Sequence, residues 1–429
     1  MRIVVTTEDK PWSDVSGNSE RSQNDLWVGE TVSSNFKGFG ACFNELGWIA
    51  LQKTSSEERD EMLRLLFSPE EMAFTYCRLP IGANDYSASW YSYNETDGDF
   101  DMSAFSIARD HEAVIPYIKA AKAIRGSELT LFASPWSPPT WMKFPQAYNH
   151  GHVIWEDRYL KAYADYFVRF VEAYEAEGIS ISAVHPQNEP DSDQKFPSCR
   201  WTGEQLRDFL RDYLAPAISS AGLTTELWLG TIERGDIRGD FNKFVLPTLA
   251  DPEARAVIKG VGFQWAGKHS IRQAQMSAPD LELIQTENEC GDGDNSWEYA
   301  HYVFNLVRHY LDHGASAYVY WNAVLEQGGV STWGWKQNSM ATVERDGTLQ
   351  KQPEFHVMRH FAGFVRPGAT VIRPKGRWAG NAIYFRNPDG KEVVVMNNPT
   401  PDAVRVTATC GGETATLDLP AYSFATLAE

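Results

Sequence analysis

The run LTLFA (Leu129–Ala133) is followed by the amphipathic stretch DRYLKAYADYFVRFVEAYE (Asp157–Glu175) and then by a second short apolar run, ISAVH (Ile181–His185). Apolar residues recur in the long stretch at the spacing of one helix face, whereas the two short runs have the length and composition of buried strands. A strand, a helix and a further strand form the repeating unit of a parallel sheet. This part of the chain therefore predicts an α/β fold.

The same alternation extends from about Phe36 to Phe364. The sequence predicts eight strands, at Gly38–Phe43, Ala73–Leu79, Leu129–Ala133, Ile181–His185, Glu226–Gly230, Gly260–Gln264, Leu281–Thr286 and Ala317–Tyr320. Helix-like stretches lie between and after them, at Ser55–Phe67, Asp110–Ala123, Asp157–Glu175, Thr202–Ser219, Phe241–Leu249, His269–Met276, Ser296–Tyr310 and Glu354–Phe364. The first helix begins with the spacing of a capping box, Ser55 to Glu58. Eight strands, each followed by a helix, predict a closed parallel (β/α)8 TIM barrel.

Both ends of the chain have a different pattern, of short β-like segments and turns. Arg2–Thr6 and Leu26–Val28 precede the barrel. Five further segments follow it, at Thr370–Ile372, Ala382–Phe385, Glu392–Met396, Ala403–Thr407 and Thr414–Leu417. Short strands separated by Gly- and Pro-containing turns predict a small β-sandwich. We therefore expect a side domain formed by residues 1–35 and 365–429, attached to a catalytic barrel of residues 36–364.

The composition restricts the partners and the location of the protein. A net charge of −18 argues against nucleic acid or an anionic membrane as partner, because both bind Lys- and Arg-rich surfaces. No segment approaches the ~20 apolar residues of a membrane span, and the opening residues MRIVVTTEDKPWSD lack the regions of a signal peptide. The five cysteines have no CxxC spacing and predict free thiols. We expect a cytoplasmic protein with a neutral substrate.

Aromatic residues are numerous, and many of them lie outside the periodic segments. The chain contains 15 Trp, 18 Tyr and 22 Phe, with clusters in irregular segments such as Trp90–Tyr93, Trp136, Trp141 and Trp333–Trp335. Pyranose rings stack their C–H faces on aromatic side chains. The clusters therefore indicate a carbohydrate-binding cleft.

Two carboxylates follow the predicted fourth and seventh strands. The fourth strand runs into HPQNEP (His185–Pro190), and the seventh runs into QTENE (Gln285–Glu289). Active sites of such barrels lie where the strands end, so Glu189 and Glu287, three βα units apart, face each other across the barrel mouth. Hydrolysis of a glycosidic bond uses two such groups, one to protonate the leaving oxygen and one to attack the anomeric carbon or activate water. The sequence therefore predicts a glycosidase that needs no metal or other cofactor.

Neighbouring residues are expected to support this pair. Burial or the charge of Glu287 would raise the pKa of Glu189, and Asn188 can donate to the sugar 2-hydroxyl. Arg78 would either hold Glu287 ionised or form a purely structural ion pair. Glu289 competes for the role of nucleophile, but at ~3.3 Å per residue it would lie about 6 to 7 Å further out. It is therefore expected to contact the substrate or to support the site.

Longer motifs resemble glycoside hydrolase family 30, a family of retaining β-glycosidases that includes the lysosomal glucosylceramidases. The similar motifs cover most of the barrel and are GFGACFNE (Gly38–Glu45), RLP (Arg78–Pro80), SPWSPPTWM (Ser134–Met142), QNEP (Gln187–Pro190), TE (Thr286–Glu287) and YWN (Tyr320–Asn322). The resemblance implies a barrel with a β-sandwich built from both chain ends, Glu189 as acid/base and Glu287 as nucleophile. It also implies that the sugar nearest this pair is surrounded by Glu45, Trp141, Asn188, Trp321 and Asn338.

The end of the sixth strand departs from the glucosylceramidases, which carry a His and a Tyr there. This chain has GFQWAGKH (Gly262–His269), with Gln264 in the His position and no Tyr. Trp265 or His269 is therefore expected to supply the missing hydrogen bond to the nucleophile. The stretch Trp321–Met340 is similar to the β-1,6-glucanase subfamily. Together these features favour β-1,6-glucan or its oligosaccharides over a ceramide substrate.

Other functions stay open at the level of sequence. An exo-acting β-glucosidase, a glucosylceramidase-like enzyme or a β-xylosidase would use the same carboxylate pair. A carbohydrate-binding protein without turnover would retain the aromatic cleft. A metal-dependent hydrolase would need a cluster of ligands; His150-Gly-His152 has the spacing of a metal site, but no further His, Asp or Glu cluster completes it.

Overall fold

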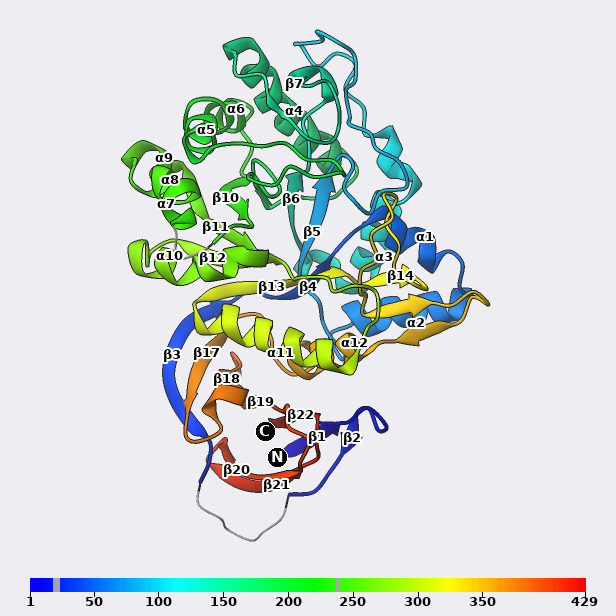
Figure 1. Cartoon of the computed structure of the whole chain (residues 1–429), viewed down its shortest axis with the longest axis vertical. Helices are drawn as coiled ribbons and strands as arrows, with labels where there is room; N and C mark the ends of the chain where they lie inside the picture. The colour runs from blue at the N-terminus through cyan, green and yellow to red at the C-terminus, as the bar shows by residue number, and fades with distance from the viewer. Residues whose placement is uncertain (18–23, 236–238) are drawn as a thin grey trace.

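The computed structural model describes residues 1–17, 24–235 and 239–429. Eight parallel strands close into a barrel, as predicted (Figure 1). Their order around the barrel is β4 (Gly38–Cys42), β5 (Tyr76–Ile81), β6 (Thr130–Pro135), β9 (Ala183–Val184), β10 (Glu226–Ile232), β11 (Ile258–Gln264), β12 (Glu282–Glu287) and β13 (Ala315–Asn322), which pairs back with β4. Each strand lies within a few residues of the apolar run that predicts it.

Side chains from the strands fill the interior of the barrel. Tyr76, Phe132, Trp228 and Ile284 belong to one buried cluster to which six strands contribute. Gly260 on β11 makes room for the largest of them, because a Cβ atom there would lie 2.5 Å from the Trp228 ring. The barrel is therefore a packed core, and its rim is the place where a ligand can bind.

Helices cover the outside of the barrel close to where the sequence predicts them. They are α2 (Ser56–Phe67), α3 (Val114–Arg125), α4 (Asp157–Ala176), α5 (Gly203–Phe209), α6 (Ala215–Ser220), α7 (Asp240–Phe244), α8 (Leu246–Leu249), α9 (Pro252–Val257), α10 (Ile271–Ser277), α11 (Trp297–Asp312) and α12 (Pro353–Ala362). The predicted cap of the first one is confirmed, since the Ser55 hydroxyl accepts a hydrogen bond from the Glu58 backbone N–H at 3.2 Å. Such a cap satisfies a donor that the helix itself leaves unpaired.

The structure differs from the predicted helices at several places, and α9 is one helix that the sequence did not predict. The short helix α1 (Glu45–Leu51) was not predicted, because seven residues are too few to show a helical period. The predicted helix Thr202–Ser219 contains a wider π turn at Leu210–Leu214. The predicted helix Phe241–Leu249 is divided into α7 and α8 next to Pro247, which has no N–H to continue the hydrogen-bond ladder.

Both chain ends build the second domain, as predicted. Its main sheet has seven strands in the order β2 (Ser13–Asp14), β1 (Arg2–Thr6), β22 (Ser423–Ala428), β19 (Glu392–Asn398), β18 (Ala382–Arg386), β17 (Ala369–Lys375) and β3 (Trp27–Phe36). A hairpin of β20 (Val404–Cys410) and β21 (Glu413–Leu419) covers one face, and apolar side chains of both layers share one core. Strand β22 was not predicted, and β3 extends well beyond Leu26–Val28.

The other face of this sheet packs on barrel helices α11 and α12, which lie between the two domains (Figure 1). The Phe304 ring of α11 lies 5.4 Å from Phe361 of α12 and 6.0 Å from Phe424 of β22. His360 of α12 is fully buried at the same contact, and its two ring nitrogens each lie 2.8 Å from a hydroxyl, of Thr6 and of Thr426. The two domains therefore share a continuous core.

His360 is expected to make the protein sensitive to acid. Burial lowers its pKa to about 3, whereas an unfolded chain has a His pKa of about 6.5. Below about pH 6.5 the unfolded state therefore binds more protons than the folded state, so the free energy of unfolding falls as the pH falls towards 3. The slope that one such His contributes is about 1.4 kcal/mol per pH unit. Urea unfolding of the wild type and of His360→Gln between pH 7 and pH 4 measures this; curves of equal slope would contradict the assignment.

Two further features of the chain are its lack of membrane-spanning helices among the described residues and its free cysteines. Within residues 1–17, 24–235 and 239–429, no helix has both the length and the apolar character needed to cross a bilayer. All five cysteines lie in these ranges, and each is buried with a free thiol, as predicted. Buried thiols ionise poorly, so these side chains act as small apolar packing groups.

Candidate active site

Glu189 stands on the rim of the barrel, on the segment that continues β9. The backbone N–H groups of His185 and Asn188 donate to β6, at Ala133 O (2.9 Å) and Pro135 O (2.7 Å), and that of Glu189 donates to Thr231 O of β10 (3.2 Å). Glu189 itself has a left-handed φ of 51°, which costs a non-glycine residue free energy and is found most often at functional sites. The two neighbouring strands thus hold Glu189 in one position.

Gln264 joins Glu189 to Glu287, the last residue of β12. Its side-chain Nε2 lies 3.0 Å from Glu189 Oε1 and 3.1 Å from Glu287 Oε2. Because one nitrogen contacts both oxygens, these two oxygens lie no more than about 6 Å apart, close enough for both carboxyl groups to reach one glycosidic bond. Gln264 therefore lies between the two carboxyl groups.

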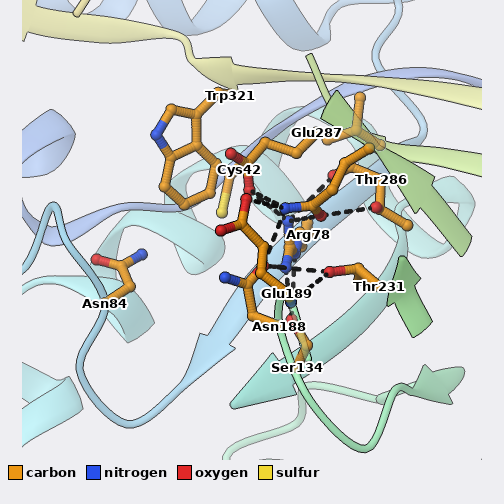
Figure 2. Close-up of polar contacts among 12 residues, drawn as sticks. Cys42, Arg78, Asn84, Ser134, Asn188, Glu189, Thr231, Thr286, Glu287 and Trp321 are labelled. Carbon is orange, nitrogen blue, oxygen red and sulfur yellow. Dashed lines mark hydrogen bonds and ion pairs between the residues drawn. The ribbon is translucent and has the colours of Figure 1, made fainter. Parts of the chain in front are cut away.

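Arg78, at the centre of Figure 2, organises the polar side chains below this pair. Its guanidinium is fully buried and forms an ion pair with Glu287 Oε2 at 2.8 Å. It also donates to Asn188 Oδ1 at 2.7 Å and to Ser134 Oγ at 2.8 Å. The flat face of the same group lies 4.5 Å from the Trp136 ring centroid. Arg78 therefore fixes both the nucleophile candidate and the amide next to Glu189.

Trp265, one of the two residues expected to hydrogen-bond Glu287, makes that contact. Its indole Nε1 donates to Glu287 Oε1 at 3.0 Å, so both oxygens of Glu287 accept hydrogen bonds. Trp265 has a left-handed φ of 46°, which turns its ring towards the site. The other candidate for this contact, His269, is exposed at the end of the following 3-10 turn and does not line the cavity.

The carboxyl groups of the site lie in a desolvated environment. Burial raises the pKa of Glu189, and the hydrogen bond from Gln264 partly opposes this rise. Burial also raises the pKa of Glu287, and there the Arg78 guanidinium opposes it most strongly. Two neighbouring carboxyl groups resist ionising together, because the second negative charge is repelled by the first. The favoured state of the pair therefore holds a single proton.

A cavity of about 180 Å³ opens above the pair. Its lining residues are Asp85, Trp136, Asn188, Glu189, Ser192, Gln194, Phe196, Glu233, Arg234, Trp265, Ala266, Glu287, Trp335 and Gln337. The ring of Trp136, which lines the cavity, stacks on the ring of Trp321 with centroids 5.5 Å apart, so the cavity has an aromatic wall. The site thus combines carboxyl groups, amides and aromatic rings, which are the groups that bind neutral sugars.

Several residues expected near the sugar lie outside this cavity. Glu45 is buried and forms an ion pair with Arg109 at 3.2 Å. The Trp141 indole N–H donates to Asn94 O at 3.0 Å, and the ring packs in the main hydrophobic core. In this structure the two residues support the loops around the cavity instead of forming its surface.

Two further such residues are Glu289, which directly follows β12, and Asn338, which lies in the long segment after β13. Glu289 forms an ion pair with Lys268 and accepts a hydrogen bond from the Tyr302 hydroxyl at 2.7 Å, so its carboxylate is occupied away from the pair. Asn338 donates to Glu354 Oε1 at 2.6 Å and accepts from the Gly293 N–H at 2.8 Å. Its contacts hold the loop that follows β12.

The cavity residues that the sequence did not indicate include Glu233, Asp85 and Gln337. Glu233 directly follows β10, so the rule that identifies Glu189 and Glu287 could have found it. Asp85 lies in the loop after β5; burial raises its pKa to about 7, and its Oδ1 has no hydrogen-bond partner among the described residues. Gln337 lies in the long segment after β13, away from the end of any barrel strand. Only the folding of its loop over the rim brings it to the site, and no sequence signal indicates this.

Among the residues that the structure describes, no group of three or more His, Cys, Asp or Glu side chains could hold a metal ion. His150 of the His150-Gly-His152 pair contacts Asp193 through its Nδ1 at 3.0 Å, in an exposed ion pair. These side chains therefore connect two surface loops.

Comparisons with known proteins agree with this architecture. The family model described as "Glycosyl hydrolase family 30 TIM-barrel domain" matches residues 36–365, and "Glycosyl hydrolase family 30 beta sandwich domain" matches residues 382–427. The chain is 26% identical to the lysosomal acid glucosylceramidase of Mus musculus, over 86% of this chain and 76% of that protein. It is 25% identical to the endo-1,6-beta-D-glucanase BGN16.3 of Trichoderma harzianum, over 86% of this chain and 79% of that protein. The crystal structure of SrfJ from Salmonella typhimurium has the same fold, with a TM-score of 0.90 and 24% identity over 100% of this chain and 99% of that one.

Proposed function

Because the chain belongs to glycosyl hydrolase family 30, and is therefore a glycoside hydrolase acting on carbohydrate, we propose that it hydrolyses β-linked glucosides with retention of configuration. The observation that carries this proposal is the Glu189–Gln264–Glu287 bridge, which limits the two nearest carboxyl oxygens to about 6 Å. Glu189 is the proposed acid/base and Glu287 the proposed nucleophile. The proposed substrate is β-1,6-glucan or its oligosaccharides.

The proposed first step forms a covalent glycosyl-enzyme. The Glu287 carboxylate attacks the anomeric carbon while the bond from that carbon to the leaving oxygen breaks, and Glu189 gives its proton to this oxygen. In the second step water attacks the anomeric carbon, Glu189 takes a proton from the water, and the bond to Glu287 breaks. The protein is regenerated with its single proton on Glu189.

The contacts of the pair support this division of roles. Glu287 has the Arg78 cation at 2.8 Å and the Trp265 N–H at 3.0 Å, and both stabilise its charged form. Glu189 has no cation within ion-pair distance among the described residues, so the single proton of the pair belongs there. Asn188 has its Oδ1 held by Arg78 and by the Thr231 hydroxyl, which leaves its Nδ2 to donate to a sugar 2-hydroxyl.

The preference for a glucan follows from the sixth strand. The related glucosylceramidase and endo-1,6-glucanase are named for substrates that differ in the leaving group, a ceramide in one and a further sugar in the other. The resemblance to the glucosylceramidases implies a His and a Tyr at the end of the sixth strand, whereas in this chain Gln264 and Trp265 contact the nucleophile candidate. This difference supports a glucan as the proposed substrate.

A hydrolysis screen with product analysis tests the proposal. Purified protein would be incubated with β-1,6-glucan, gentiobiose, β-1,3-glucan, xylan and aryl β-glycosides, and reducing ends would be measured. The highest kcat/KM is expected on β-1,6-linked glucose. Proton NMR during the first minutes is expected to show the β-anomer before mutarotation, because two displacements restore the configuration. An initial α-anomer would exclude retention, and activity confined to xylan would exclude the glucoside assignment.

A further inference from the structure

The residues that line the cavity differ in exposure. Asp85 and Trp136 are 4% and 1% exposed. The Arg234 side chain is 45% exposed, and Trp335 is half-buried, so the part of the cavity that these two residues line is its open side. A substrate longer than one sugar needs an accessible part of the cavity. The leaving group is therefore expected on the open side once a glycosyl unit occupies the buried part.

Glu233 is a buried polar group next to Arg234 on the open side. It is 3% exposed, and its Oε1 accepts hydrogen bonds from the Ser192 hydroxyl at 2.9 Å and from the Asp191 backbone N–H at 3.0 Å. The Arg234 Nε lies 3.6 Å from the same oxygen. These three contacts all converge on Oε1 and fix the orientation of the carboxyl group, and its other oxygen takes part in none of them.

The surroundings of Glu233 suit a hydroxyl group. Burial raises the pKa of Glu233 to about 8, so below that pH the carboxyl group can both donate and accept a hydrogen bond. The proposed acid Glu189 lines the same cavity, one strand away, so Glu233 lies on the side from which the leaving oxygen is protonated. A sugar leaving group presents several hydroxyls close to the bond that breaks, whereas a lipid or nitrophenyl leaving group presents few or none.

Aromatic rings complete this side of the cavity. Trp265 and Trp335 have ring centroids 5.9 Å apart, and Trp335 in turn lies 5.3 Å from Trp333, which contacts Phe196 at 5.3 Å. These rings come from loops after three different strands and meet only in the folded protein. A pyranose can stack on such a surface while its hydroxyls reach a carboxyl group.

We propose that Glu233 binds a hydroxyl group of the sugar that leaves, and so makes the enzyme selective for a saccharide leaving group. This inference rests on the proposed function, because it assumes that Glu189 protonates the leaving oxygen. Glu233 is a specificity-determining residue in this proposal, and it takes no part in the two displacement steps.

Kinetics with two leaving groups test the inference. Glu233→Ala and the wild type would be compared on gentiobiose and on 4-nitrophenyl β-glucoside, which share the glucosyl unit but differ in the leaving group. The ratio of kcat/KM on gentiobiose to kcat/KM on the aryl glucoside is expected to fall by about tenfold or more, the size expected for a lost hydrogen bond to a buried, fixed partner. Glu233→Gln keeps a donor and an acceptor and is expected to restore most of the ratio.

Glu226→Gln is the matched control, because Glu226 begins the same strand at the end of the barrel away from the cavity. Its ratio is expected to equal that of the wild type. Equal losses on both substrates in Glu233→Ala would overturn the inference, because they would place the effect on the common chemistry or on the fold. If the wild type hydrolyses neither substrate, the proposed function fails instead.

A partition experiment gives a second result that does not depend on the amount of folded protein. Glucose added to the aryl glucoside reaction competes with water for the glycosyl-enzyme and forms a disaccharide in the leaving-group site. The ratio of disaccharide to hydrolysis product is expected to fall in Glu233→Ala, because both products arise from one intermediate. An unchanged ratio would contradict binding of a sugar by Glu233.

Discussion

Replacing Glu287 with Ala is expected to abolish hydrolysis of an aryl β-glucoside. Glu287 is the last residue of β12, and both oxygens of its carboxylate accept hydrogen bonds at the site. The donors are the Arg78 guanidinium and the Trp265 indole N–H. Without it no covalent intermediate can form, and a loss on the order of 10⁴-fold or more in kcat is expected. Release of nitrophenol measures the loss, and thermal unfolding verifies that the variant is folded.

Glu289→Gln is the informative comparison for this prediction. Glu289 lies two residues further along the chain and has its carboxylate occupied by Lys268 and Tyr302. It is therefore expected to retain most of the activity. Full activity in Glu287→Ala, or a loss confined to Glu289→Gln, would show that the nucleophile has been misassigned.

Replacing Glu189 with Ala is expected to lower turnover in proportion to the need of the leaving group for a proton. For gentiobiose, whose alkoxide leaves poorly, a loss of about 10² to 10⁴-fold is expected, the usual contribution of a general acid. For 4-nitrophenyl β-glucoside the first step needs no proton, so the second step limits the rate. Sodium azide is then expected to raise turnover, because it attacks the anomeric carbon and displaces Glu287 without a general base.

The azide product distinguishes this explanation from a structural one. Attack on the glycosyl-enzyme from the face opposite to Glu287 yields the β-glucosyl azide, which NMR identifies. The basic limb of the pH profile reports loss of the Glu189 proton, so it is expected in the wild type and absent in the variant. A variant equally impaired on both substrates and insensitive to azide would argue against Glu189 as the acid/base.

Much of the fold could be predicted because its signals are local. Each barrel strand is a short apolar run and most helices are amphipathic, so burial on both faces or on one face is visible within a window of a few residues. β22 escaped prediction, although it pairs with β1 along its length. Its segment carries no distinctive pattern, and its partner lies at the other end of the chain. Pairing between such distant segments depends on the completed fold.

The site could be predicted in part for the same reason. Glu189 and Glu287 directly follow strands, so topology alone brings them to one rim. Glu45, Trp141 and Asn338 also belong to motifs of the family, yet in this structure their side chains contact loops around the cavity. Glu233 also directly follows a strand and Asp85 lies in a loop after one, but whether such a side chain reaches the cavity depends on how each loop turns.

The sequence by itself determined the barrel, the side domain built from both chain ends, and the strands that carry the two carboxylates, because hydrophobic periodicity and strand order are properties of the chain. Only the tertiary structure decided the environment of those carboxylates. Arg78, Gln264 and Trp265 come from the second and sixth strands, and together they contact Glu287 within 3.1 Å. The energy of a charge depends on the distance to its partners and on its exclusion from water, and both are set only when distant strands meet around one axis.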